Sequence, residues 1–203
     1  MTKITHASIV LCGALGLLLG ANAMAADVAA GKAKAEQLCT SCHGADGNSV
    51  NPEWPKLAGQ HAGYLAKQLA DFKAGRRKSD TMASMATDLT PEEMLALGVY
   101  FEQKPTKPRP ARDVELAGVG RYIFHRGNES SGVAACAGCH GENGHGTEQL
   151  PRLAGQVPRY IEDQLRSFNK RERTNDNAIM HSIASKLTEL EIKGVAMYIS
   201  SLE

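Results

Sequence analysis

Two short stretches of the chain combine a pair of cysteines with an adjacent histidine. C-T-S-C-H occupies residues 39–43, and C-A-G-C-H occupies residues 136–140. C-x-x-C-H is the attachment signature of a c-type haem. On a helical turn the two thiols share one face and form thioethers to the haem vinyl groups, while the histidine lies under the iron as its proximal ligand. The predicted attachment residues are Cys39, Cys42, Cys136 and Cys139, and the predicted proximal ligands are His43 and His140.

Zinc knuckles and redox dithiols also use C-x-x-C pairs. A zinc site needs four ligands that converge on one ion, whereas Cys42 and Cys136 lie far apart in the sequence. The sequence therefore favours two covalent haem c groups over either alternative.

An iron bound by one histidine needs a sixth ligand if it only carries electrons, and methionine is the ligand that raises the potential. Met82 and Met180 follow the two proximal histidines by 39 and 40 residues. An isolated methionine is more often core filler, and Met85 is a second candidate in the first half. A gapless alignment of the two methionine segments places Met82 on Met180 and Met85 on Ile183. We therefore predict Met82 and Met180 as the axial ligands and Met85 as a core residue that lines the pocket.

Two prolines follow the haem motifs at matched positions. Pro55 lies 12 residues after His43, and Pro151 lies 11 residues after His140. A carbonyl that accepts the second N–H of a ligand imidazole fixes its tautomer and basicity, so we expect each proline carbonyl to contact its histidine. A simple turn proline is the alternative.

Arg77 and Arg173 occupy equivalent places in the two halves and are candidates to pair with haem propionates. The alternative for the first is a solvated run of charges at residues 76–78. We expect Trp54 to pack on a haem edge. The other histidines after residue 25 are His61, His125, His145 and His181, and none has the spacing expected of an iron ligand. Of the four, His125 is the one we single out for comparison with the structure.

The haem motifs belong to an internal repeat. P-K-L-A-G-Q at residues 55–60 returns as P-R-L-A-G-Q at 151–156, and a Y-x-x-x-Q-L-x-x-F pattern is also used twice, at an offset of 96 to 98 residues. Such self-similarity indicates two copies of one structural unit. We expect domains at residues 26–104 and 113–203, with a proline-rich, extended linker at residues 105–112.

Each copy has the pattern of helices and loops, without the alternation typical of strands. A first helix leads into the haem motif, and a second presents Leu65, Leu69 and Phe72 on one face. A third begins at a capping box that starts at Thr90 and returns at Thr188. The predicted fold class is all-α.

Residues 1–25 have the features of a signal peptide: Lys3, a short apolar run and A-M-A before the expected cleavage site. The run is too short to span a bilayer, which disfavours the alternative of a permanent anchor. Cleavage removes Cys12, so that every remaining cysteine belongs to a haem motif. We therefore expect export to the periplasm.

Charge and aromatic content limit the function classes. The chain has 23 Lys and Arg against 22 Asp and Glu, and neither half is a polycation, so nucleic-acid binding has no support. Aromatic residues make up 5% of the chain, which is low for two cores. A buried porphyrin in each domain would supply the missing apolar surface.

The paired haem motifs, the duplicated P-x-L-A-G-Q, the Y-x-x-x-Q-L-x-x-F helix and the proline-rich link together resemble the di-haem cytochrome c4 family. The resemblance covers essentially all of the chain after residue 25. It implies two class I cytochrome c domains packed face to face about a pseudo-twofold axis. The second copy departs from the first by extra residues at 128–132, which leaves the length of its first helix open.

The resemblance further implies a periplasmic electron carrier that delivers electrons towards a terminal oxidase and in some members is loosely attached to the membrane. We expect a non-enzymatic monomer, reduced by an upstream quinol-oxidising complex. Two rivals remain: a di-haem enzyme (a peroxidase or a thiosulfate-oxidising cytochrome), which needs one open haem face, and a haem subunit of a larger complex.

Overall fold

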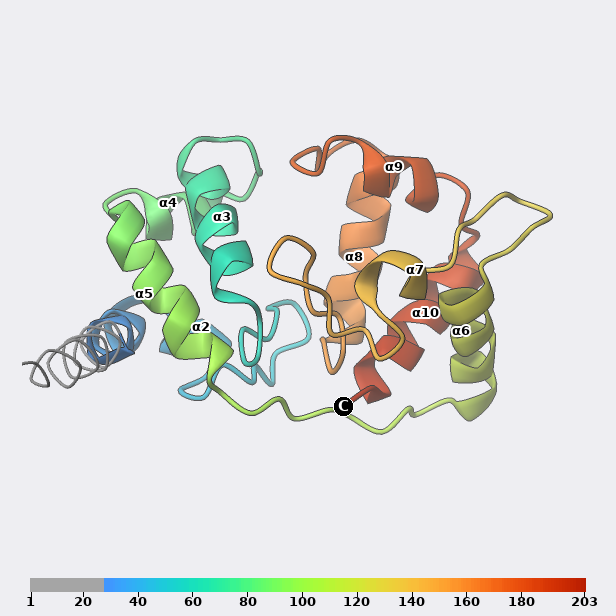
Figure 1. The fold of residues 1–203 in the computed structure, drawn as a ribbon, viewed down its shortest axis with the longest axis horizontal. Coiled ribbons are helices and arrows are strands. Elements are labelled where there is room, and N and C mark those ends of the chain that lie inside the picture. Colours follow the sequence, from blue (N-terminus) through green and yellow to red (C-terminus); the bar gives the residue numbers. More distant parts are fainter. Residues whose placement is uncertain (1–27) are drawn as a thin grey trace, which may run out of the picture.

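A computed structural model describes residues 28–203; the predicted signal peptide, with Cys12, lies outside the described residues. Helices account for all regular elements of this part of the chain apart from one isolated β-bridge, which confirms the all-α class. The helix at residues 28–38 precedes α2 (Thr40–His43), α3 (Ala62–Lys73), α4 (Asp80–Ala86), α5 (Pro91–Glu102), α6 (Val114–Arg126), α7 (Ala137–His140), α8 (Pro158–Asn169), α9 (Ile179–Ala184) and α10 (Glu189–Ser201). Figure 1 shows two helical domains side by side, with α2–α5 in the first and α6–α10 in the second.

The last helix of each domain begins at the predicted capping box. Thr90 and Glu93 cap α5 reciprocally, and Thr188 and Glu191 cap α10 in the same way. Each box satisfies N–H groups that a helix start leaves without intrahelical partners. Helices α5 and α10 therefore begin at the residues that the sequence predicted.

In each domain the first and last helices cross at a glycine. A Cβ on Gly120 in α6 would lie 1.9 Å from the Gly194 carbonyl oxygen in α10, and a Cβ on Gly31 would lie 2.0 Å from the Ala96 carbonyl oxygen in α5. No larger residue fits such a backbone approach. The close crossing packs the two apolar cores, which centre on Phe101 in domain 1 and Phe124 in domain 2.

The structure gives the extra residues of the second copy a definite conformation. Helix α6 ends at Arg126, Gly127 takes a positive φ of 70°, and Asn128 pairs with Val133 in the isolated bridge. Lys186 Nζ donates to the Gly132 carbonyl at 3.0 Å, which ties this loop to the segment before α10. The first helix of domain 2 is thus continuous from Val114 to Arg126, and the extra residues form a loop after it.

The two domains meet through hydrogen bonds that occur in reciprocal pairs. Arg77 donates to the Tyr160 hydroxyl at 2.8 Å, and Arg173 donates to the Tyr64 hydroxyl at 3.0 Å. Because each bond has its counterpart under exchange of the domains, the interface has the expected pseudo-twofold arrangement. The same exchange relates the glutamines at the ends of the two P-x-L-A-G-Q motifs.

The segment between α5 and α6 runs along one side of both domains (Figure 1) and is bonded to them rather than free. Lys107 N donates to Asn48 Oδ1 at 2.9 Å in domain 1, and Arg109 N donates to the Ser200 carbonyl at 2.8 Å in domain 2. The linker therefore contributes to domain docking. Among residues 28–203 there is no helix with the length and apolar character needed to cross a membrane.

Candidate haem sites

Both C-x-x-C-H motifs fold into a single helical turn. His43 N donates to the Cys39 carbonyl at 2.9 Å in α2, and His140 N donates to the Cys136 carbonyl at 2.9 Å in α7. This turn places both cysteines of a pair on one side, as two thioether bonds to one porphyrin require. All four cysteines are free of disulfide bonds.

The two motif histidines are buried and have one ring nitrogen committed to a carbonyl. His43 Nδ1 lies 2.8 Å from the Pro55 oxygen, and His140 Nδ1 lies 3.1 Å from the Pro151 oxygen, so both contacts expected from the sequence are present. Within residues 28–203 neither Nε2 has a hydrogen-bond partner. Burial lowers the pKa of both imidazoles, against a smaller opposing effect of the carbonyl bond. Each ring is thus neutral, with Nδ1 as donor and the lone pair of Nε2 available to a metal.

Thiol chemistry disfavours the redox-dithiol alternative. Burial, with the neighbouring thiol as a smaller contribution, raises the pKa of Cys39 to about 11, and burial likewise raises the pKa of Cys136 to about 11. A reactive dithiol requires a depressed pKa, because the thiolate is the nucleophile. Residues 28–203 also contain no cluster of three or more His, Cys, Asp or Glu side chains able to hold a metal ion, which gives the zinc alternative no support.

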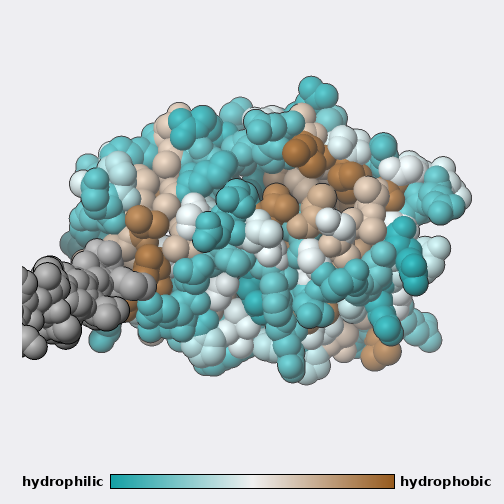
Figure 2. All heavy atoms as spheres, in the orientation of Figure 1, coloured by the Kyte–Doolittle hydropathy of each residue, from teal (hydrophilic) through white to brown (hydrophobic). Residues whose placement is uncertain are grey.

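Met82 and Met180 both lie, partly buried, at the margin of a core. Met82 borders the domain 1 core together with Cys39 and Leu57, and Met180 borders the domain 2 core in the same manner. An apolar margin between a thiol and a methionine fits a porphyrin, which would cover both. In domain 2 this margin is visible as a group of hydrophobic side chains at the surface between α7 and α9 (Figure 2).

The prediction that Met85 is a core residue is wrong. Its side chain is 41% exposed and lies beside Leu38 at a shallow surface pocket, whereas the aligned Ile183 packs against the domain 2 core. Val133, in the loop at residues 128–133, belongs to that core. Domain 1 has no counterpart of this loop, and its Met85 lies instead beside Lys34 and Leu38 of the helix at residues 28–38.

Arg77 and Arg173 are buried at the domain interface, which overturns the solvated-charge interpretation of Arg77. Arg77 donates to Gln68 in its own domain and Gln164 in the other, and Arg173 donates to the same two glutamines. These acceptors are neutral, so the guanidinium charges retain the capacity to pair with an anion. We propose, as the sequence suggested, that haem propionates approach them.

Arg77→Gln is expected to lower the reduction potential of one haem, because a nearby positive charge favours the reduced iron. The free energy of reduction should become less favourable by roughly 1–2 kcal/mol. Arg76→Gln is the matched control: Arg76 pairs with Asp71 at 2.7 Å at an exposed position, so its loss should leave both potentials in place. A spectroscopic redox titration of both variants checks this. Identical titration curves for the wild type and Arg77→Gln would remove the propionate role.

Trp54 is 36% exposed and lines a surface pocket of about 360 Å³ together with Cys42 and Val50. This position beside the thioether cysteine is compatible with the expected packing on a haem edge. Polar residues and Lys107 also line this pocket.

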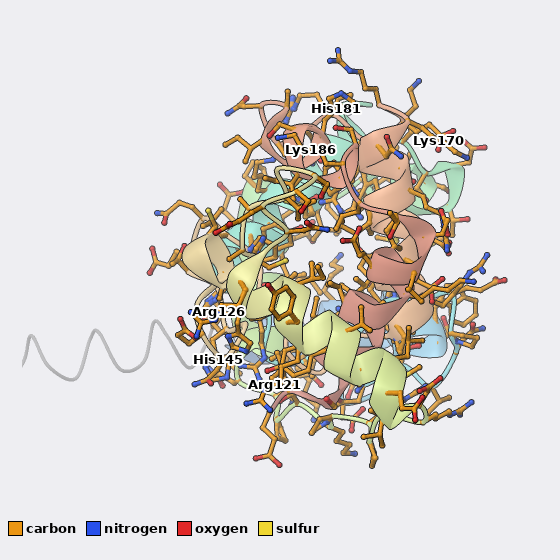
Figure 3. The ribbon with its side chains drawn as sticks, turned by 90° about the vertical axis from the view of Figure 1, so that its right-hand side faces the viewer. Arg121, Arg126, His145, Lys170, His181 and Lys186 are labelled. Atoms are coloured by element: carbon orange, nitrogen blue, oxygen red, sulfur yellow. The ribbon has the colours of Figure 1, made fainter. Side chains whose placement is uncertain are left out.

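The remaining histidines are engaged elsewhere. His125 bridges Glu142 at 3.0 Å and the Tyr198 hydroxyl at 2.8 Å, which uses both ring nitrogens. His145 and His181 lie well apart on domain 2 (Figure 3), and each contacts a main-chain oxygen, that of Glu203 and that of Phe168. Each of these histidines therefore already has a hydrogen-bond partner in the protein.

Known proteins show the same architecture over nearly the whole chain. The cytochrome c family model matches residues 28–103 and 124–203. A cytochrome c4 from Thiocapsa roseopersicina is 44% identical over 180 residues, covering 87% of this chain and 93% of that protein. The chain belongs to the cytochrome c4 family. It follows that it is a di-haem electron-transfer cytochrome with two covalently bound haem c groups, as the motifs predicted.

Two further relatives bear on the structure and on the partners. The crystal structure of reduced recombinant cytochrome c4 from Pseudomonas stutzeri superimposes with a TM-score of 0.83 at 38% identity, covering 87% of this chain and 98% of that one. A protein named thiosulfate dehydrogenase electron acceptor, from Stutzerimonas stutzeri, is 36% identical over 202 residues and 94% of its length is covered. The cytochrome c4 fold therefore serves more than one named role.

Proposed function

We propose that this cytochrome c4 family member shuttles single electrons in the periplasm, with His43 and Met82 on the first iron and His140 and Met180 on the second. The observation that carries the proposal is that each domain has a buried histidine whose Nδ1 is bound to a proline carbonyl, and a methionine that borders the same core as the first cysteine of the haem motif. When bound, each haem supplies the Fe(III)/Fe(II) couple.

The residues of the chain set the conditions of that couple. Each proline carbonyl holds its histidine in the Nδ1–H tautomer and raises the electron density of the ring. The apolar margins exclude water, and two closed axial positions suit electron transfer rather than peroxide or oxygen activation. The di-haem enzyme alternative would need an axial position without a protein ligand.

A spectroscopic redox titration tests this proposal. Two His/Met haems that titrate reversibly, with no five-coordinate species and no peroxidase activity, are the expected result. A five-coordinate or ligand-exchanging haem in the resting protein would instead favour the enzyme.

The direction of flow is the finer part of the proposal: electrons enter from a quinol-oxidising complex and leave towards a terminal oxidase. The similarity to a thiosulfate dehydrogenase electron acceptor favours a second donor, namely an enzyme that oxidises thiosulfate. Stopped-flow reduction by each donor, at matched concentrations, separates the two. The donor whose reduction rate exceeds that of the other under these conditions is the physiological candidate.

A further inference from the structure

Two glutamines at the domain interface clamp the backbone of the opposite domain. Gln156 Oε1 accepts the Lys56 N–H at 2.8 Å, and Gln156 Nε2 donates to the Lys56 carbonyl at 3.0 Å. Gln60 makes the same pair of bonds to Arg152, both at 2.9 Å. Both glutamine side chains are buried. Buried side-chain amides with satisfied donors and acceptors hold a backbone segment in one position.

The peptide group that Gln156 holds is the one that accepts the proximal histidine of domain 1. The Pro55 carbonyl and the Lys56 N–H form a single planar amide. Its oxygen lies 2.8 Å from His43 Nδ1, and its N–H donates to Gln156. The chain of groups is therefore imidazole N–H, peptide carbonyl, peptide N–H and glutamine carbonyl.

Domain 2 contains the same chain with the domains exchanged. His140 Nδ1 lies 3.1 Å from the Pro151 oxygen, and the N–H of that peptide, which belongs to Arg152, donates to Gln60 at 2.9 Å. Hydrogen bonds linked through one amide polarise each other, so that a bond at the N–H strengthens the acceptor at the oxygen. Each glutamine thus strengthens the hydrogen bond donated by the histidine of the other domain.

We infer that Gln156 and Gln60 each tune the reduction potential of the haem in the opposite domain. The inference rests on the proposed ligation of iron by His43 and His140. An imidazole that donates more strongly at Nδ1 is more electron-rich at Nε2, which stabilises the ferric state and lowers the potential. The docking of the two domains thereby contributes to the reduction potential of each haem. The two glutamines are positioning residues, because they act through the proline peptide and the histidine rather than on the haem itself.

Gln156→Met tests the crosswise effect, because methionine has a similar length and lacks the amide. We expect the first haem, in the domain that was not mutated, to become about threefold to tenfold easier to reduce, a rise of roughly 30–60 mV at about 59 mV per tenfold. The second haem should keep its potential. Gln60→Met should produce the reverse pattern, and the haems are assigned by the band that Met82→Ala removes.

A second readout follows the hydrogen bond itself. In the reduced, nitrogen-15-labelled protein, the Nδ1–H proton of His43 should move to lower chemical shift in Gln156→Met, since a weaker hydrogen bond deshields its proton less. The corresponding proton of His140 should stay in place. This measurement is independent of any change in haem exposure.

His61→Gln is the matched control, since His61 Nε2 contacts the His145 carbonyl at 2.8 Å across the same interface without touching either proline peptide. It should leave both potentials unchanged. The inference is overturned if neither haem shifts in the glutamine variants, if the haem of the mutated domain shifts instead, or if His61→Gln reproduces the effect. A wild type without two His/Met haems would refute the proposed function itself, which the first titration reveals.

Discussion

Replacing Met82 with alanine will abolish one of the two far-red methionine-to-ferric-iron absorption contributions and lower the potential of one haem by an amount on the order of a few tenths of a volt. The reason is that a neutral thioether favours the ferrous state, and the axial ligand is a main determinant of haem potential. The absorption spectrum of the oxidised protein and a redox titration measure both effects. The second haem, served by Met180, should be unaffected.

Met85→Ala provides the control three residues away. Because the Met85 side chain is 41% exposed, its truncation should change the free energy of unfolding by no more than about 0.5 kcal/mol and leave both absorption contributions intact. If Met85→Ala removed a contribution while Met82→Ala preserved both, the ligand assignment would be wrong. The alignment of Met82 with Met180 would then have no bearing on ligation.

The double substitution Cys39→Ala and Cys42→Ala should produce a protein with one covalent haem and an unfolded first domain. Cys39 and Met82 both border the core of domain 1, and without a covalently held porphyrin that apolar margin would be open to water. Open apolar surface costs about 25 cal/mol per Å², a large sum for a domain with few aromatic residues. Intact mass and hydrogen exchange of the exported protein measure haem content and protection.

In that variant, the amides of α6–α10 should keep their protection while those of α3–α5 lose it. The wild type should carry two covalent haems and no thiol that alkylates in denaturant. Two haems in the double variant, or a single haem with full protection of domain 1, would contradict the assignment. The equivalent substitution of Cys136 and Cys139 should exchange the roles of the domains.

Much of the site follows from local sequence. C-x-x-C-H imposes its geometry within one helical turn, since the residues that bind one porphyrin are adjacent in the chain. The position of Pro55 at a fixed distance after His43 also places an acceptor near Nδ1, and the structure contains that contact. The capping box at Thr90 is similarly a local arrangement of backbone and side chain.

The exposure of Met85 required the tertiary structure. Its segment aligns with that of domain 2 without gaps, yet Met85 is 41% exposed, whereas the aligned Ile183 packs against the domain 2 core. A repeat in sequence therefore did not guarantee a repeat in environment.

The interface was the other part that sequence patterns did not reveal. Arg77 looked as suited to solvent as to a buried site, because a charged residue is placed by its partners, and two of these, Tyr160 and Gln164, lie more than eighty positions away. Gln60 and Gln156 had a signal, the duplicated P-x-L-A-G-Q, but its last position acts on the other domain. The sequence by itself determined the haem motifs and the helices, because these depend on contacts within a few turns of the chain. It also determined the duplication, because the two copies keep the same motifs in the same order. Only the docking of two domains decided which polar groups meet, since those contacts require both surfaces at once.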